Sequence, residues 1–382
     1  MSLGHGMRGE WGLDPDFLTV NHGSFGATPR VVRAAQRAWQ DRMERQPSRF
    51  MSRELPTALR RAAATLAAFL NADGGDLVFV DNATTGCNAV LRSLALRPGD
   101  EVLILSHVYN AIRNTTRHVA ARTGAAIVEV PVRLPDPTAA SILAAVGAHL
   151  TERTRVAVID HITSASALVL PVGELVALCH RRGVPVLIDG AHAPGQIDLD
   201  LTAIGADWYV GNCHKWLCAP KGCAFLYATR ADGLHPGTIS HGYGQGFVAE
   251  FDWTGTTDPS RFLAVTEAIA FHDRLGGVAL RARNTALAAE ATALLARRLN
   301  TQPGASGALT AAMGVVRLPV GDPSPEHAPR LRQRLMELGA DAPVHALDGA
   351  LWLRLSAFAY NEIDDYERLA TLVAAVLRED AS

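Results

Sequence analysis

The sequence has no long apolar run and no excess of basic residues. A membrane-spanning helix needs about 20 consecutive apolar residues, and no stretch of this chain provides them. The first ten residues mix glycines with charges and lack the apolar core of a secretory signal peptide. The 36 Lys and Arg residues are balanced by 38 Asp and Glu, giving a net charge of -2. We therefore expect a soluble protein that binds neither membranes nor nucleic acid.

Cysteine is also scarce, which bears on compartment and on metal binding. There are five cysteines, an odd number, and no signal peptide is expected, so a disulfide framework is not predicted. Three of them lie close together in sequence, but their spacing differs from the CxxC pattern of zinc sites. We predict small buried side chains in a reducing, cytoplasmic setting and no bound metal. The cysteines are Cys87, Cys179, Cys213, Cys218 and Cys223.

The middle of the chain alternates short apolar runs with helical patterns. This alternation predicts an α/β domain, and near-continuous apolar strands are typical of a parallel sheet covered by helices on both faces. Seven strands are expected, which makes a mostly parallel seven-stranded sheet. The expected strands are Leu77–Val80, Val102–Leu105, Ala126–Val130, Val156–Ile159, Val184–Ile188, Asp207–Val210 and Ala224–Tyr227.

The pattern changes after about residue 258. A long helical stretch, interrupted at Gly276-Gly277, is followed by two strand-like segments and two further helices. This mixture predicts a second, smaller α+β domain. We therefore divide the chain into an N-terminal arm (residues 1–18), a large domain (19–258) and a small C-terminal domain (259–382).

Two residues in the large domain carry the chemistry. Asp189 ends an apolar strand and is followed by a glycine, and Lys215 comes 26 residues later, just after another expected strand. Ligands of open α/β sheets bind beyond the carboxyl ends of the strands, so both side chains can reach one crevice. Pyridoxal 5'-phosphate (PLP) needs such a pair: a lysine to form a Schiff base and an acid facing the pyridine nitrogen. Either residue alone is better explained by a turn or a surface position, and only the two together favour a PLP site.

A phosphate site is expected where the first strand of the sheet meets its helix. The segment Asp81-Asn82-Ala83-Thr84-Thr85-Gly86 follows an apolar strand and opens a helical pattern. Helix N-terminal amides attract anions, and the two threonine hydroxyls add hydrogen-bond donors. An ordinary helix cap would have the same composition, so the segment alone leaves both interpretations open.

Together, Asp189-Gly-Ala-His192 and Asn212-Cys-His214-Lys215 resemble the signature of the class V aminotransferase family, a branch of fold-type I PLP enzymes. The resemblance extends from about Thr19 to about Leu377. It implies that Lys215 forms the Schiff base and moves protons at the substrate α-carbon, while Asp189 pairs with the pyridine nitrogen. It further implies cofactor contacts from Tyr109 on the ring face, Ser164 and His192 at the ring oxygen, and Thr84, Thr85 and His214 at the phosphate.

The resemblance also implies a homodimer with shared active sites. Thr256, in a Thr-Gly-Thr-Thr turn, is similar to the residue that reaches the phosphate of the partner subunit. Arg354 resembles the arginine that binds the substrate carboxylate, a task suited to its planar fork. The loop containing Asn21 and His22 would lie over the pocket of an amino-acid-like substrate. For each of these segments a plain loop or a surface salt bridge is the alternative.

The sequence argues against one reaction of this family and leaves three others open. A cysteine desulfurase needs a cysteine shortly before the carboxylate arginine, and this chain has none after Cys223. Segments around Asn21 and Arg354 resemble the isopenicillin N epimerase-like subgroup, so an epimerase acting on an amino acid or small peptide is placed first. A C–S lyase and a class V transaminase are the alternatives. The second proton carrier of an epimerase stays open between Tyr109, His22 and His345, and the intact Lys215 argues against a non-catalytic binding protein.

Overall fold

A seven-stranded sheet forms the centre of the large domain in the computed structural model, which describes residues 3–380. Its strand order is β2-β8-β7-β6-β5-β3-β4, and every neighbouring pair is parallel except the two pairs made by β8. The mostly parallel seven-stranded sheet predicted from the sequence is thus confirmed. The strands are β2 (Leu77–Val80), β3 (Glu101–Leu105), β4 (Ala126–Val130), β5 (Thr154–Asp160), β6 (Val186–Asp189), β7 (Trp208–Asn212) and β8 (Ala224–Ala228).

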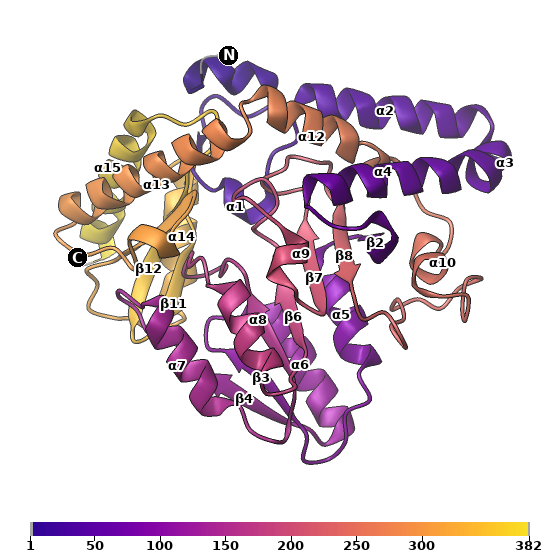
Figure 1. Ribbon diagram of the computed structural model, residues 1–382. Helices are drawn as coiled ribbons and strands as arrows, with labels where there is room; N and C mark the ends of the chain where they lie inside the picture. Colours follow the sequence, from indigo (N-terminus) through magenta and orange to yellow (C-terminus); the bar gives the residue numbers. More distant parts are fainter. Residues whose placement is uncertain (1–2, 381–382) are drawn as a thin grey trace.

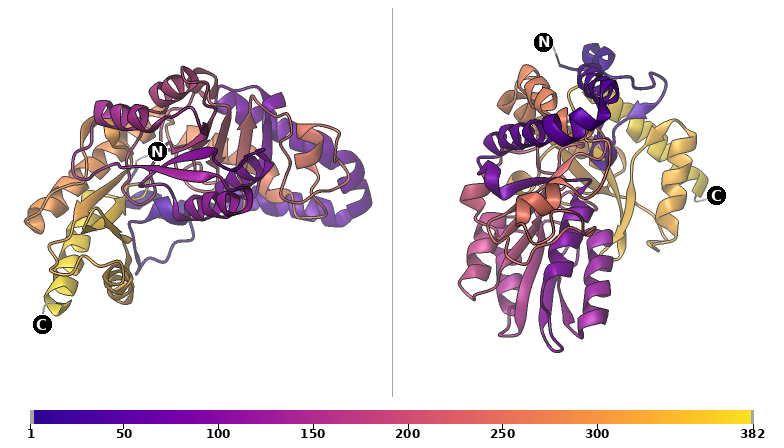
Figure 2. Two further views of the ribbon diagram at one scale, coloured as in Figure 1. Left: turned by 90° about the horizontal axis from the view of Figure 1, so that it is seen from below. Right: turned by 90° about the vertical axis from the view of Figure 1, so that its right-hand side faces the viewer.

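Helices cover both faces of this sheet, because successive residues of each buried strand point to opposite sides. Val102 and Ile104 of β3 pack with α5 (Ala83–Ser93) and α6 (Asn110–Thr123). Leu103 and Leu105 belong to the core on the other face, with α4 (Leu55–Phe69), α7 (Ala139–His149) and α8 (Val172–His180). Figures 1 and 2 show the resulting three layers.

Local signals account for where several of these helices begin and end. Asn82 caps α5 by accepting a hydrogen bond from the backbone of Thr85. Thr138 and Ser141 form a reciprocal capping box at the start of α7. Gly124 ends α6 with a left-handed φ of 75°, a conformation that glycine adopts without a steric penalty.

A long helical hairpin precedes the sheet and packs on one side of it. It consists of α2 (Arg30–Arg45), α3 (Pro47–Arg49), the π-helix η2 (Phe50–Glu54) and α4. Helix α12 (Val265–Arg274) packs against α2 and α4, as Figure 1 shows. Short elements fill the connections: α1 (His22–Phe25), η3 (Gly74–Asp76), α9 (Leu201–Ile204), α10 (Phe247–Asp252), α11 (Ser260–Leu263) and η4 (Gly307–Leu309).

The small domain is an antiparallel sheet covered by three helices. Its strands follow the order β11-β12-β9, with β9 (Met313–Arg317), β11 (Val344–Leu347) and β12 (Ala350–Ser356). Strand β11 is not among the expected strands, since four residues ahead of a tight turn give little periodicity. The helices are α13 (Val278–Arg298), α14 (His327–Glu337) and α15 (Ile363–Asp380), and a short β1 (Leu18–Thr19) pairs with β10 (Ala340–Asp341).

Helix α13 contributes to two of the three hydrophobic cores, that on one face of the large sheet and that of the small domain. Leu280 belongs to the core of the large domain, whereas residues from Ala288 onward belong to the core of the small domain. Leu18 and Val20, near the start of the chain, also join the small-domain core. The domain limits expected from the sequence, with a boundary at residue 259, stay a prediction.

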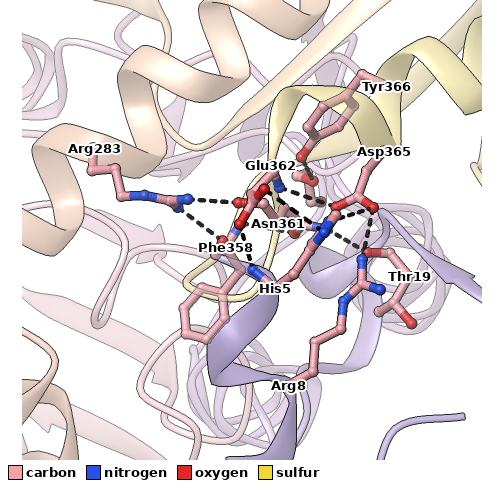
Figure 3. A network of polar contacts seen from close by, with 10 residues as sticks. His5, Arg8, Thr19, Arg283, Phe358, Asn361, Glu362, Asp365 and Tyr366 are labelled. Carbon is pink, nitrogen blue, oxygen red and sulfur yellow. Dashed lines mark hydrogen bonds and ion pairs between the residues drawn. The ribbon is translucent and has the colours of Figure 1, made fainter. Parts of the chain in front are cut away.

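The N-terminal segment is tied to the last helix of the chain by charged groups. Asp365, at the start of α15, accepts hydrogen bonds from His5 (3.0 Å) and Arg8 (2.7 Å) of the short helix η1 (His5–Glu10). The same carboxylate accepts a bond from the Asn361 amide at 3.0 Å. Figure 3 shows how these side chains converge from both ends of the chain. Within residues 3–380, no helix is both long and apolar enough to cross a bilayer.

Candidate active site

The carboxyl ends of β6 and β7 bring Asp189 and Lys215 into one cavity of about 460 Å³. The cavity lies at the edge of the parallel sheet where ligands of such folds bind. Eight of the nine residues expected around the cofactor line it. The lining residues are Ser24, Phe25, Asn82, Ala83, Thr84, Thr85, Tyr109, Asp160, Ile162, Ser164, Asp189, Ala191, His192, Asn212, His214 and Lys215.

Lys215 is chemically distinguished by its surroundings and by its rarity. The chain contains only two lysines, Lys215 and Lys221. Burial first, and then the nearby charge of Arg354, lower the pKa of Lys215 to about 8, whereas Asp189 acts in the opposite direction. An amine with such a pKa has a much larger neutral, nucleophilic fraction near neutral pH than an exposed lysine. Lys215 is therefore suited to form a Schiff base and to carry protons.

His192 lies next to this amine. Its Nε2 is 3.1 Å from the Nζ of Lys215, while its Nδ1 is buried without a hydrogen-bonding partner. Burial and the neighbouring cations hold the pKa of His192 well below its usual range, so the ring is neutral. When the ammonium of Lys215 donates to Nε2, the proton of the imidazole must sit on Nδ1. This buried N–H in the cavity wall is free to bind a ligand atom.

Asp189 supplies a buried carboxyl group at the end of β6. It is 3% exposed and accepts a hydrogen bond from the Ala191 backbone at 3.0 Å. Burial raises its pKa, whereas the Ala191 amide and Lys215 lower it. A protonated pyridine nitrogen would supply the countercharge that such a buried carboxylate requires. The residue therefore fits the pyridine end of PLP.

The N-terminus of α5 forms the opposite end of the cavity. The Asn82 side chain caps this helix, and Ala83 donates its backbone N–H to Asn212 at 2.9 Å. The side chains of Thr84 and Thr85 line the cavity at this helix terminus, where the dipole and the amides favour an anion. This geometry fits a phosphate group.

His214 also lines the cavity, and its neutral ring carries the proton on Nδ1. Its Nδ1 donates to the Cys223 carbonyl at 3.1 Å, and burial lowers its pKa to about 4. A neutral ring with its proton on Nδ1 offers only an acceptor at Nε2. His214 can hold a phosphate only if the bound anion raises its pKa and the ring takes up a second proton.

Tyr109 stands at the start of α6 with 45% of its surface exposed. Its backbone N–H donates to Asp160 at 3.3 Å, which fixes the position of the residue at the cavity edge. An aromatic ring that stays open to a cavity while its backbone is anchored can stack on a flat ligand.

Arg354 reaches the cavity edge from strand β12 of the small domain. The residue is 2% exposed and donates to Ser164 and Ser24, both of which line the cavity, at 2.6 and 2.7 Å. It also donates to Asn21 at 2.9 Å, and its Nε finds no acceptor. No carboxylate of residues 3–380 forms an ion pair with it, and burial lowers its pKa to about 10. A buried cation that meets only neutral acceptors favours the arrival of a substrate carboxylate.

Two residues expected at the substrate have other positions. His22 is 2% exposed, stacks on Phe358, and does not line the cavity. Its Nε2 donates to the Lys215 carbonyl at 3.1 Å, so its Nδ1 must accept from the Tyr360 hydroxyl at 2.8 Å. His22 thus supports the backbone of Lys215 from outside the cavity, and its expected contact with substrate stays a prediction. No local pattern signals the hydrogen bond to Lys215, because the partner lies 193 residues away.

Asn21 and Thr256 also lie outside the cavity of their own chain. Asn21 donates to Asp341 at 2.6 Å and accepts from Arg354, so it positions the arginine. Thr256 is exposed, in the turn between α10 and α11, and is the one expected cofactor residue that does not line the cavity.

The cavity includes residues that sequence reasoning missed. Ser24 and Phe25 lie in the glycine-rich loop already noted around Asn21, and Asn212 lies in the segment that ends at Lys215. Asp160 could have been predicted as a site residue from the sequence, because it ends an apolar strand as Asp189 does. These strands are neighbours in the sheet, a fact that only the strand order reveals.

The fold and the site define an α/β enzyme with a buried lysine–aspartate pair and an anion site at a helix N-terminus. The family model "Aminotransferase class-V" matches residues 23–315. The chain belongs to the class V aminotransferase family. This confirms the predicted family, its fold and its cofactor, PLP, and it identifies the protein as an enzyme.

Two kinds of curated relatives cover nearly the whole chain. A probable chloroplastic L-cysteine desulfhydrase of Arabidopsis thaliana is 34% identical, over 96% of this chain and 84% of the relative. Putative L-cysteine desulfhydrase 1 of Oryza sativa subsp. japonica is 37% identical, over 93% and 82%. The isopenicillin N epimerase of Streptomyces clavuligerus is 34% identical, over 97% and 98%. The predicted likeness to the epimerases is confirmed, and a likeness to desulfhydrases stands beside it.

Solved structures of PLP-dependent enzymes share the fold of this chain. The cystine C–S lyase C-DES, in complex with its product cysteine persulfide, has a TM-score of 0.79 and 24% identity, covering 94% of this chain and 98% of its own. A cysteine desulfurase from Thermococcus onnurineus NA1 has a TM-score of 0.80 and 15% identity, covering 99% of both chains. At these identities the likeness concerns the fold alone.

Proposed function

We propose that this enzyme is a PLP-dependent C–S lyase that releases sulfide from L-cysteine or a similarly small β-thiol amino acid. The balanced reaction converts cysteine and water into pyruvate, ammonia and hydrogen sulfide. The observation that carries the proposal is the single amine of the cavity lining, Lys215, in a space of about 460 Å³ that must hold both cofactor and substrate. Such a space is sufficient for the cofactor together with a small amino acid.

Arg354, Asp189 and Lys215 have separate tasks in this reaction. Arg354 receives the substrate α-carboxylate, which replaces some of its bonds to neutral acceptors. Bound beside Asp189, PLP supplies an electron sink for the pair of electrons left at the α-carbon. Lys215 takes the α-proton as a general base and can return it to the departing sulfur as a general acid. One proton carrier on one face is sufficient for elimination.

The cysteines of the chain support release of sulfide over its transfer to the protein. All five are buried free thiols, and none lines the cavity. Burial raises the pKa of Cys218 to about 12 and that of Cys179 to about 11, which keeps these thiols protonated and unreactive. Free buried thiols also suit the reducing, cytoplasmic compartment proposed from the sequence.

An epimerase is the second candidate. The epimerase of Streptomyces clavuligerus covers almost the full chain, and Tyr109 offers a hydroxyl in the same cavity as Lys215. Epimerisation needs a proton carrier on each face of the α-carbon, and Tyr109 would be the second. The motifs around Asn21 and Arg354 place this candidate first, whereas the single amine of the cavity and the likeness to L-cysteine desulfhydrases favour elimination.

The experiment is incubation of the holoenzyme with L-cysteine and with small peptides in heavy water. We expect sulfide, pyruvate and ammonia in equal amounts from cysteine, and no such products from Lys215→Ala. Arg354→Lys should raise KM by about 10- to 100-fold, whereas Arg317→Lys, an exposed position of the same small sheet, should leave it unchanged. Retention of the amine with inversion at the α-carbon would instead establish the epimerase, and a keto acid with sulfur retained would establish a transaminase.

We further propose that two copies of the chain share their active sites. Thr256 is exposed on its own subunit, and its turn follows α10 at the surface. Placed against the cavity of a second copy, the turn would bring its hydroxyl to the phosphate end. An isologous dimer repeats this contact in both sites.

A further inference from the structure

A second buried carboxyl group lies beside Asp189 in the cavity. Asp160 ends strand β5, and its backbone is in register with Asp189 at the end of β6. Neighbouring strands are about 4.8 Å apart, and in-register residues of a parallel pair point to the same face. Both side chains line the cavity, and they are 2% and 3% exposed. No step of the proposed elimination involves Asp160.

The two carboxyl groups differ in their partners. Asp160 Oδ1 accepts the Tyr109 backbone N–H at 3.3 Å, whereas its Oδ2 is buried and meets no hydrogen-bonding partner. No cation among residues 3–380 forms an ion pair with Asp160. Asp189 accepts a shorter bond from Ala191 at 3.0 Å, and the positive charge of Lys215 stabilises its ionised form.

The charges around the pair favour one proton shared between two carboxyls. Arg113 of α6 is the cation that lowers the pKa of Asp160, but its guanidinium is bound to Glu129 and to the Ser106 carbonyl at 2.9 Å. Burial raises the pKa of the Cys87 thiol of α5, and the charges of Asp189 and Asp160 raise it further, so this neighbour is protonated and adds no charge. Burial first, and then the charge of Asp189, raise the pKa of Asp160 well above its usual range. Two carboxylates this close cannot both ionise cheaply.

We propose that Asp160 is a neutral carboxylic acid and a positioning residue of the site. Its Oδ1 anchors the backbone of Tyr109, and its protonated Oδ2 presents a donor beside Asp189. Asp189 then stays the sole anion facing the pyridine nitrogen, so the pair carries one proton and one negative charge. The inference rests on the PLP assignment of this site and holds whichever bond of the substrate breaks.

Infrared difference spectroscopy of the holoenzyme tests the protonation state directly. At about pH 8, comparison of the wild type with Asp160→Asn should reveal the loss of a carbonyl band of a protonated carboxyl. Asp252→Asn is the matched control, since Asp252 is salt-bridged to Arg60 at 2.6 Å and burial raises its pKa only to about 6. That control should remove a carboxylate band and no protonated one. Loss of a carboxylate band from Asp160→Asn would overturn the proposal.

The pH dependence of the cofactor's visible absorbance gives a second readout. Replacing a neutral acid with a neutral amide should leave the apparent pKa of this absorbance within about 0.3 units. Removing a negative charge about 5 Å from Asp189 would lower this apparent pKa by on the order of one unit or more, which would contradict the proposal.

PLP binding by two variants gives a third readout. Asp160→Ala loses both hydrogen-bonding atoms and should weaken PLP binding by about tenfold, and Asp160→Asn should restore most of that loss. Equal weakening in both variants would also overturn the proposal.

Discussion

At the scale of single residues, several groups in or beside the cavity are buried without a full set of hydrogen-bonding partners. Lys215, His192 and Arg354 each lie in or beside the cavity, and for each burial is the first cause of a lowered pKa. A buried imidazole nitrogen of His192 and the Nε of Arg354 meet no acceptor or donor. Such groups are costly in a folded protein, and they are retained where a ligand completes their bonding.

The unfavourable burial of the Lys215 ammonium predicts that the stability of the protein without its cofactor depends on pH. The pKa of Lys215 falls from 10.5 in the unfolded chain to about 8 in the folded one. Between these values the unfolded state binds more protons, so stability rises with pH. Below about pH 8, Lys215→Met should therefore be more stable than the wild type by about 1 to 3 kcal/mol.

Urea denaturation of the two apoproteins from about pH 7 to 10.5 checks this expectation. The difference in the free energy of unfolding should shrink as the pH rises and vanish near 10.5. Lys221→Met, the other lysine of the chain, should show a smaller change of the same sign, because burial also lowers the pKa of Lys221. A difference that stays constant across this range would show that the gain comes from packing and has no connection with the charge of Lys215.

At the scale of elements, close approach between helix α5 and strand β7 places the anion site. A Cβ at Gly86 would come within 2.7 Å of the Val210 side chain, so only glycine lets this helix lie directly on the sheet. Asn212, at the end of the same strand, binds the backbone of Ala83 at 2.9 Å. The helix N-terminus and the strand that leads to Lys215 are thereby fixed to each other.

Gly86→Ala should consequently destabilise the protein and weaken its hold on PLP. The added methyl group forces a shift of the helix, and overpacking of this kind costs about 1 to 3 kcal/mol. Gly173→Ala is the matched control, because Gly173 is an exposed helical residue of α8 where an added Cβ would meet no atom within 4 Å. The higher helix propensity of alanine should improve stability there by about 0.5 to 1 kcal/mol. Thermal unfolding and PLP titration of both variants would reveal equal shifts if packing at Gly86 were irrelevant.

At the scale of the whole molecule, the site is assembled from segments far apart in the chain. Arg354 of the small domain contacts Asn21 near the N-terminus and Ser164 of the large domain. The charge network around Asp365 holds the N-terminal helix η1 against α15 (Figure 3). Arg354, the residue proposed to bind the substrate carboxylate, is therefore positioned only when both domains and the N-terminal segment are folded together.

Shared sites in a homodimer lead to a test by mixing inactive variants. Lys215→Ala removes the lysine of a site, and Thr256→Asp places a negative charge where the partner's phosphate is proposed to bind. A mixed dimer of these two variants contains one intact site, since each chain supplies what the other lacks. After subunit exchange, activity should return to about a quarter of the wild-type value, because half of the dimers are mixed and each has one intact site of two. Activity that stays absent after mixing would mean that Thr256 acts within its own chain. A Thr256→Asp homodimer that is active by itself would mean that Thr256 plays no part in the site.

The sequence by itself determined the order of elements and the identity of the central residues. Apolar strands and alternating helices were sufficient to predict the sheet, since burial on both faces leaves a continuous apolar run. Asp189 and Lys215 were recognisable because their strands end beside glycine and polar residues. The tertiary structure decided which strand ends are neighbours, and so revealed Asp160 beside Asp189. It also placed His22 outside the cavity, where hydrogen bonds to Lys215 and Tyr360 join residues that the sequence separates by 193 and 338 positions.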